Sequence, residues 1–174
     1  LNKEFGNAES TLAPLVDVKG LVPYQRIEIY EGLGDANKGL GDVQKALEFY
    51  QEGLQIAEKN QISPKVIDLN SKIAETYARD NRLVEAEGFF ANSLNLSKKV
   101  APERQIQENE KVADFYNEKN RYEDEIQLRK QSLNELQQLP SVSVNKDNAT
   151  AGLPDSITSQ QINYKIVIIV KKYK

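Results

Sequence analysis

Carboxylates are the side chains in this sequence that could carry chemistry, because the groups that most often do so are missing. The chain has no His and no Cys, which removes the commonest general base and metal ligand and any thiol nucleophile. Asp and Glu are plentiful, at 26 of 174 residues, and paired carboxylates can act as general acid and base. No pair stands out in an apolar setting, so we expect no catalytic activity, no cofactor and no bound metal.

Two stretches resemble ligand loops only in part. Gly32–Asp42 reads GLGDANKGLGD, but it lacks the preceding buried strand and the Lys-Ser or Lys-Thr that a phosphate loop needs. The acidic run Glu123–Glu125 has no calcium-loop spacing, and Asn145–Asn148 lacks the glycine and the terminal glutamate. We therefore interpret Gly34 and Gly41 as packing positions and the acidic run as a solvated surface.

The composition indicates a helical stack and argues against nucleic-acid-binding and membrane proteins. Apolar residues make up 39% of the chain, which is low for one closed core and suits a thin stack of helices. The formal net charge of −3 gives no basis for general attraction to nucleic acid or to an anionic membrane. No run approaches about 18 uninterrupted apolar residues, so we expect no membrane insertion.

The start of the chain also bears on its class. It opens with Leu-Asn-Lys and has no charged-then-apolar leader, so we expect a signal peptide to be absent or already removed. The lack of any Met in a chain of this length suggests a fragment, or a sequence from which Met residues have been lost.

A repeating helical pattern would position the polar side chains. Three segments each carry apolar residues one helical turn apart, break at polar turn residues and then resume the pattern, as two helices joined by a tight turn would do. The period is 40 and then 39 residues, marked by the anchors Leu33, Ile73 and Val112. A small residue follows each anchor directly, and a turn residue follows eight positions after it, at Gly41, Asn81 and Asn120.

A proline precedes each anchor by nine or ten residues, at Pro23, Pro64 and Pro102. Proline is favoured in the first turn of a helix, where its missing N–H costs nothing. Each proline is therefore predicted to open the first helix of its repeat. Ser63 is predicted to be the N-cap of the helix that Pro64 opens.

This pattern resembles the tetratricopeptide repeat (TPR) family over roughly residues 24–138. The family motif has a large and a small residue at positions seven and eight, an aromatic at eleven and a turn residue at fifteen. Ala then follows at twenty, an aromatic at twenty-four and a small residue at twenty-seven. The first repeat meets this motif with Leu33, Gly34, Gly41, Ala46, Tyr50 and Gly53, and the second with Ile73, Ala74, Tyr77, Asn81, Ala86, Phe90 and Ser93.

The resemblance implies an all-α fold, namely a right-handed α-solenoid of TPR-like hairpins with three full repeats and one C-terminal helix. We place an irregular segment or partial capping helix at 1–22, and the repeats at about 23–62, 63–100 and 101–138. An inserted loop follows at 139–157, and the first helix of a truncated fourth repeat at 158–174.

The C-terminal helix is predicted from an alignment within the chain. QINYKIVIIVKKYK matches DLNSKIAETYARDN, which pairs Ile166 with Ile73. The run Ile166–Val170 also has high β propensity, so a strand is the alternative. As a helix without its partner, this segment would leave an apolar patch that could support self-association.

The sequence also departs from the family motif. Asn37 replaces the aromatic at position eleven of the first repeat. Glu125 and Arg129 occupy the places of Ala and an aromatic in the third repeat. We expect looser or shifted packing of that second helix.

In the TPR family, positions two, five, nine, twelve and thirteen of each first helix line a concave groove. Of the thirteen residues that the resemblance assigns to this groove, eight are acidic and two are basic. It implies a basic or neutral extended peptide as ligand, and Glu31 and Asp35 exclude the subclass that clamps a C-terminal carboxylate. The assigned residues are Glu28, Glu31, Asp35, Lys38, Asp68, Ser71, Glu75, Arg79, Gln107, Glu110, Asp114, Asn117 and Glu118.

Two functions follow from the resemblance. The first is a non-catalytic module that binds a protein or peptide in an acidic groove. The alternative is a sensory input domain of a larger bacterial signalling protein, because long-period arrays of this kind resemble those of bacterial sensor histidine kinases. A bacterial source is favoured, and the compartment is left open between periplasm and cytoplasm.

Overall fold

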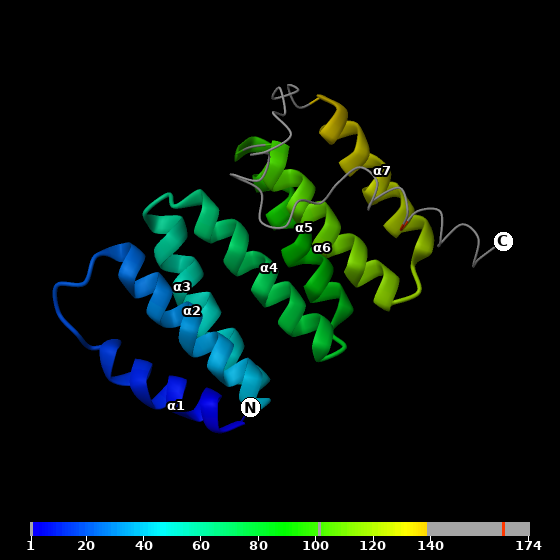
Figure 1. Cartoon of the computed structure of the whole chain (residues 1–174). Coiled ribbons are helices and arrows are strands. Elements are labelled where there is room, and N and C mark those ends of the chain that lie inside the picture. The colour runs from blue at the N-terminus through cyan, green and yellow to red at the C-terminus, as the bar shows by residue number, and fades with distance from the viewer. Residues whose placement is uncertain (1, 101, 139–164, 166–174) are drawn as a thin grey trace, which may run out of the picture. The chain divides into compact units, whose positions relative to one another are not determined.

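Every element in the described part of the chain is helical (Figure 1). This computed structural model describes residues 2–100, 102–138 and 165, and the predicted all-α fold is confirmed for them. The predicted loop at 139–157 lies outside these residues. So does the predicted C-terminal helix, with its strand alternative and its self-association, apart from Lys165, which is helical. The elements are α1 (Asn2–Leu12), the 3-10 helix η1 (Ala13–Leu15), α2 (Pro23–Leu40), α3 (Val43–Lys59), α4 (Ser63–Arg79), α5 (Leu83–Val100), α6 (Pro102–Glu118) and α7 (Tyr122–Gln138).

The chain forms two compact units, Leu1–Leu96 and Ser97–Lys174. The first contains α1 to α4 and most of α5, and in Figure 1 its helices lie side by side. The second contains α6 and α7, which form a hairpin. None of the described helices combines the length and the apolar character needed to cross a membrane.

The helices begin where the prolines predict. Pro23 is the first residue of α2 and Pro102 the first of α6, while Pro64 is the second residue of α4. The N-cap predicted at Ser63 is wrong by one position, because Ile62 is the N-cap and Ser63 is already helical. Ile62 has no side-chain acceptor, so α4 begins without a capping side chain.

The predicted turn residues reverse the chain at the end of each first helix. Gly41 has a φ of 86°, and Asn81 and Asn120 both have a φ of 60°. This left-handed conformation is open to glycine and is tolerated by asparagine. These three residues therefore end α2, α4 and α6 and let the second helix of each hairpin fold back.

The core of the first unit is built around the predicted anchors. Leu33, Ile73 and Ala46 are completely buried, as is Tyr50. A Cβ atom on Gly34 would lie 2.3 Å from Cε1 of Tyr50, so only glycine allows α2 to approach this ring. Asn37, at a position where the TPR motif has an aromatic, is also buried, and its Nδ2 donates to the carbonyl of Leu33 at 2.9 Å.

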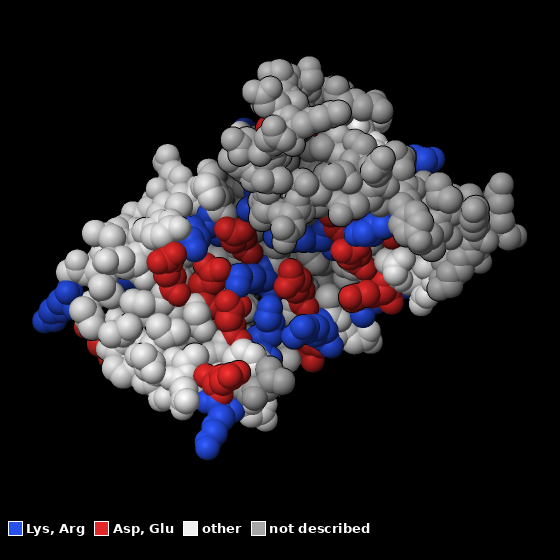
Figure 2. Space-filling model, viewed as in Figure 1, with Lys and Arg blue, Asp and Glu red and all other residues white. Residues whose placement is uncertain are grey.

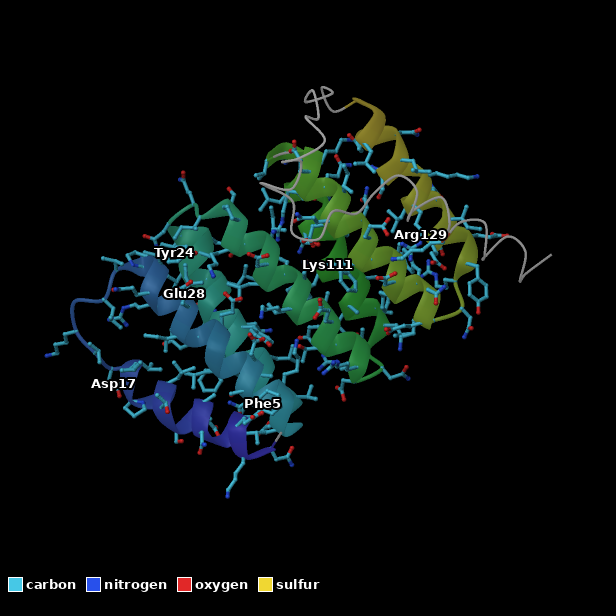
Figure 3. All side chains as sticks on the ribbon, in the orientation of Figure 1. Phe5, Asp17, Tyr24, Glu28, Lys111 and Arg129 are labelled. Atoms are coloured by element: carbon cyan, nitrogen blue, oxygen red, sulfur yellow. The ribbon has the colours of Figure 1, made fainter. Side chains whose placement is uncertain are left out.

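The N-terminal helix α1 packs on two other glycines of the same run (Figure 3). A Cβ atom on Gly39 would lie 2.5 Å from the ring of Phe5, and one on Gly32 would lie 2.7 Å from Cδ1 of Leu12. Phe5 and Leu12 are seven residues apart on α1, and their partners Gly39 and Gly32 are seven apart in the reverse order on α2, so the two helices run antiparallel. The glycine run of α2 therefore serves two neighbours, with Gly34 facing α3 and Gly32 and Gly39 facing α1.

Candidate functional site

A row of ion pairs joins α2 to α4 in the first unit. Lys72 Nζ lies 2.7 Å from both carboxylate oxygens of Asp35 and 3.3 Å from Glu31. Lys65 Nζ lies 2.9 Å from Glu31 and 3.5 Å from Glu28. Figure 2 shows acidic and basic side chains gathered on the face that it displays, where α2 and α4 lie. We call this set, with Lys38 and Glu75 (3.6 Å apart), the charged row.

Three of the four carboxylates in the charged row are more exposed than its ammonium groups, whereas the fourth, Glu31, is only 18% exposed. The side chains of Glu28, Asp35 and Glu75 are 54%, 42% and 44% exposed. Those of Lys65, Lys72 and Lys38 are only 13%, 25% and 19% exposed. A molecule that approaches this face therefore meets carboxylates first, although lysines neutralise much of their charge.

Tyr50 is buried beneath the charged row and contacts three of its residues. Its hydroxyl donates to Oδ1 of Asp35 at 2.6 Å, and its ring lies 5.8 Å from Nζ of Lys72 and 5.9 Å from Nζ of Lys38. Burial raises the pKa of Tyr50 well above its ordinary value, and the hydrogen bond and the charge of Asp35 raise it further. Tyr50 is therefore a neutral hydrogen-bond donor at any physiological pH.

Two lysines of the row, Lys72 and Lys65, have raised pKa values. Burial alone would lower the pKa of Lys72, but its hydrogen bonds to Asp35 and the charges of Asp35 and Glu31 outweigh burial and raise it. The pKa of Lys65 is raised in the same way, because Glu31 outweighs the effect of burial. Lys65 also lies over the ring of Tyr24, with Nζ 5.1 Å from the centroid (Figure 3).

The second unit holds a buried ion cluster between α6 and α7 (Figure 3). Arg129 on α7 is 2% exposed, and its Nη2 lies 2.5 Å from Asp114 while its Nη1 pairs with Glu110. Its Nε donates to Glu125 at 2.9 Å, and Glu125 also accepts from Asn117 at 2.7 Å. Carboxylates at hydrogen-bonding distance outweigh burial and raise the pKa of Arg129.

This cluster explains the departure from the family motif in the third repeat. We expected looser or shifted packing of α7, because Glu125 and Arg129 replace Ala and an aromatic. Instead both side chains are fully buried and pair with each other and with α6. Charge complementarity fills the place that apolar packing fills in the first repeat.

The partners of Lys165 in the second unit hold the same repeat positions as the partners of Lys72 in the first. Lys165 Nζ lies 3.5 Å from Glu110 and 3.4 Å from Asp114. These two residues hold the positions of Glu31 and Asp35 in their repeat, and the internal alignment pairs Lys165 with Lys72. A lysine one residue before an anchor thus contacts the same two acidic positions in both units.

The structure separates the thirteen predicted groove residues into three groups. Seven of them belong to the ion pairs above, namely Glu28, Glu31, Asp35, Lys38, Glu75, Glu110 and Asp114. Ser71 is only 1% exposed, so it cannot line an open groove as predicted. Glu110, although it has partners, is also buried, at 5% exposure. The others are Arg79, Asn117 and Glu118, which are exposed, and Asp68 and Gln107, which are half-buried.

Sequence reasoning missed the residues that donate to these carboxylates. Tyr50 and Arg129 were assigned to packing positions, and Lys65 was given no role. A signal did exist for Lys72 and Lys165, because each directly precedes an anchor or its aligned equivalent, but Lys111 has the same place and pairs with Glu108 on its own helix. Within the described residues, no group of His, Cys, Asp or Glu is arranged to hold a metal ion.

Comparison with known proteins supports the helical fold. A scan against protein-family models finds no match, and a search of curated proteins finds none either. Among solved structures, the chain is similar to BtubC (BKLC) from P. vanneervenii, with a TM-score of 0.71 and 19% sequence identity. The match covers 97% of this chain but 66% of the BtubC chain, so this chain spans just under two thirds of its length. At this identity, the likeness shows the fold alone.

Proposed function

We propose that this chain is a non-catalytic interaction module, a right-handed TPR-like α-solenoid that binds an extended basic peptide through carboxylates of its first helices. One observation carries the proposal: the charged row exposes Asp35, Glu75 and Glu28 while it covers the lysines that pair with them. In the second unit Asp114 is likewise exposed, at 57%, above a fully buried Arg129.

The hydrogen bonds behind the carboxylates favour such binding. A carboxylate already held by Tyr50 or Arg129 loses little freedom when a ligand pairs with it. Each exposed pair should still contribute little, about 0.2–1 kcal/mol, because solvent screens it. Affinity would therefore need several pairs at once and would fall as salt is added.

The test compares binding of fluorescent oligolysine and oligoglutamate at low and high salt. We expect oligolysine to bind at low salt and to bind more weakly at high salt or after Glu75→Lys or Asp114→Lys. Glu58→Lys is the matched control, because it makes the same charge change on an exposed position of α3. Preference for oligoglutamate, or equal effects of all three substitutions, would refute the proposal.

A further inference from the structure

Two buried donors occupy the same repeat position in the two units. Tyr50 follows the anchor Leu33 by 17 residues, and Arg129 follows the anchor Val112 by 17. Each lies on the second helix of its hairpin and is at most 2% exposed. Their chemistry differs, since one is a phenol and the other a guanidinium, but both donate hydrogen bonds.

Both donors also reach the same acceptor position. Tyr50 donates to Asp35 at 2.6 Å and Arg129 donates to Asp114 at 2.5 Å, and each aspartate follows its anchor by two residues. The aspartates are 42% and 57% exposed, and each also pairs with a lysine, Asp35 with Lys72 and Asp114 with Lys165. An approaching molecule can contact the aspartate but not the donor behind it.

The second repeat lacks this arrangement. Glu75 occupies the acceptor position, but the donor position holds Phe90, which is 2% exposed and has no hydroxyl. Glu75 instead pairs with Lys38 at 3.6 Å, beyond hydrogen-bonding distance. Of the three described residues at this acceptor position, Asp35 and Asp114 accept from a buried donor, and Glu75 has Phe90 at the donor position.

We propose that Tyr50 and Arg129 are positioning residues that fix Asp35 and Asp114 for a cationic ligand group, while Glu75 is left adjustable. This inference rests on the proposed function, because it concerns the same carboxylates. The buried donors, together with Lys72 and Lys165, hold each carboxylate in one orientation before a ligand arrives, and the ligand then avoids the entropy cost of ordering it. Each donor is itself held in a closed setting, Tyr50 against Gly34 and Arg129 among carboxylates of α6 and α7.

The first experiment measures oligolysine affinity after Tyr50→Phe, which removes one hydroxyl and keeps the ring. We expect affinity to fall about two- to tenfold, the cost of ordering one side chain. Tyr30→Phe is the matched control, since it removes a hydroxyl from a half-buried tyrosine of α2. In a double-mutant cycle, Tyr50→Phe should have no further effect once Asp35→Asn is present, because the two act through one carboxylate.

The second experiment adds the missing donor. Phe90→Tyr places a hydroxyl at the equivalent position behind Glu75, so oligolysine affinity should rise by a similar factor. This gain should disappear in a Glu75→Gln background. Circular dichroism checks the fold of each variant, and should Tyr50→Phe lose helical signal, the result for Phe90→Tyr decides.

The outcomes separate the inference from the proposed function. If oligolysine binds and depends on Asp35 and Asp114, but Tyr50→Phe behaves like Tyr30→Phe and Phe90→Tyr adds nothing, the inference is wrong and the proposed function stands. If wild-type protein does not bind oligolysine at low salt, both are overturned. A merely structural role for Tyr50 would lower the melting temperature without the predicted coupling to Asp35.

Discussion

A single glycine sets how closely α2 and α3 approach. A Cβ at position 34 would lie 2.3 Å from the completely buried ring of Tyr50, which has no room to move. We expect Gly34→Ala to lower the free energy of unfolding by about 1–3 kcal/mol through overpacking. Gly88→Ala is the control, because a Cβ there meets nothing within 4 Å and should stabilise α5 by roughly 0.5–1 kcal/mol. Urea unfolding of both variants measures the difference, and equal effects would contradict this packing.

Tyr50 and Lys72 make a second prediction at this scale, for alkaline pH. Both pKa values are raised in the folded chain, Tyr50 by burial and Asp35, and Lys72 by Asp35 and Glu31 despite burial. A group whose pKa is higher in the folded chain than in the unfolded chain stabilises the fold fully at any pH below its unfolded pKa, which is about 10 for both groups. This stabilisation is lost as the pH rises above that value towards the folded pKa.

We therefore expect the melting temperature to fall steeply above about pH 10. The melting temperature of the Tyr50→Phe variant should fall less steeply over that range, since this variant has no phenol at position 50 whose ionisation favours the unfolded chain. Thermal melts across this pH range, followed by circular dichroism, provide the measurement. Identical slopes for wild type and variant would show that Tyr50 ionises normally in the folded protein.

At the scale of elements, α1 is the helix most easily separated from its unit. None of its residues is fully buried, and it rests on α2 through Phe5 over Gly39 and Leu12 over Gly32. Gly39→Val should block this contact, and amide exchange in α1 should then accelerate by about tenfold to hundredfold while α3 and α4 stay protected.

Gly6→Ala tests the same helix in the opposite direction. A Cβ at Gly6 meets nothing within 4 Å, so alanine should strengthen α1 and slow its exchange. Hydrogen exchange read by mass spectrometry measures both variants. Exchange in α1 that does not respond to Gly39→Val would mean that the glycine face is not what holds this helix.

The helices themselves were largely predictable, because their signals are local. Apolar spacing, the three prolines and the turn residues Gly41, Asn81 and Asn120 mark where the first helices begin and end. The N-cap at Ser63 was wrong by one residue, since a serine before proline fits either position. A partial capping helix at 1–22 was one of two alternatives, but its contacts were not predicted, because Phe5 and Gly39 lie 34 residues apart and share no period.

The candidate site was less predictable than the helices. The family resemblance assigned acidic residues to one face, but their partners come from other helices. Arg129 was read as a defect in an apolar pattern, whereas three carboxylates pair with it inside the hairpin. Such pairings depend on three-dimensional proximity, which residue type and spacing along one helix do not encode.

At the scale of the whole molecule, the reactivity of each lysine should depend on how exposed its side chain is and how closely it is paired. Lys65 is 13% exposed and lies 2.9 Å from Glu31, whereas Lys45 is 56% exposed and lies 3.6 Å from Asp42. An amine-reactive ester should therefore modify Lys45 well before Lys65. In the Glu31→Gln variant, the labelling rate of Lys65 should rise towards that of Lys45. Mass spectrometry of briefly labelled protein reports both rates. Equal labelling of the two lysines in wild-type protein would show that the charged row is open to solvent.

The shared partners of Lys72 and Lys165 bear on how such a chain can lengthen. Each repeat that pairs in this way has one acidic residue two positions before its anchor and another two positions after it. Both pair with the lysine that directly precedes the next anchor. In the second unit, Glu110 and Lys165 lie 55 positions apart, but in the first unit donor and acceptor lie together on one stretch of about 40 residues, from Glu31 to Lys72. A tandem duplication of that stretch copies a matched junction, so a new repeat is compatible with its neighbour before any further mutation occurs.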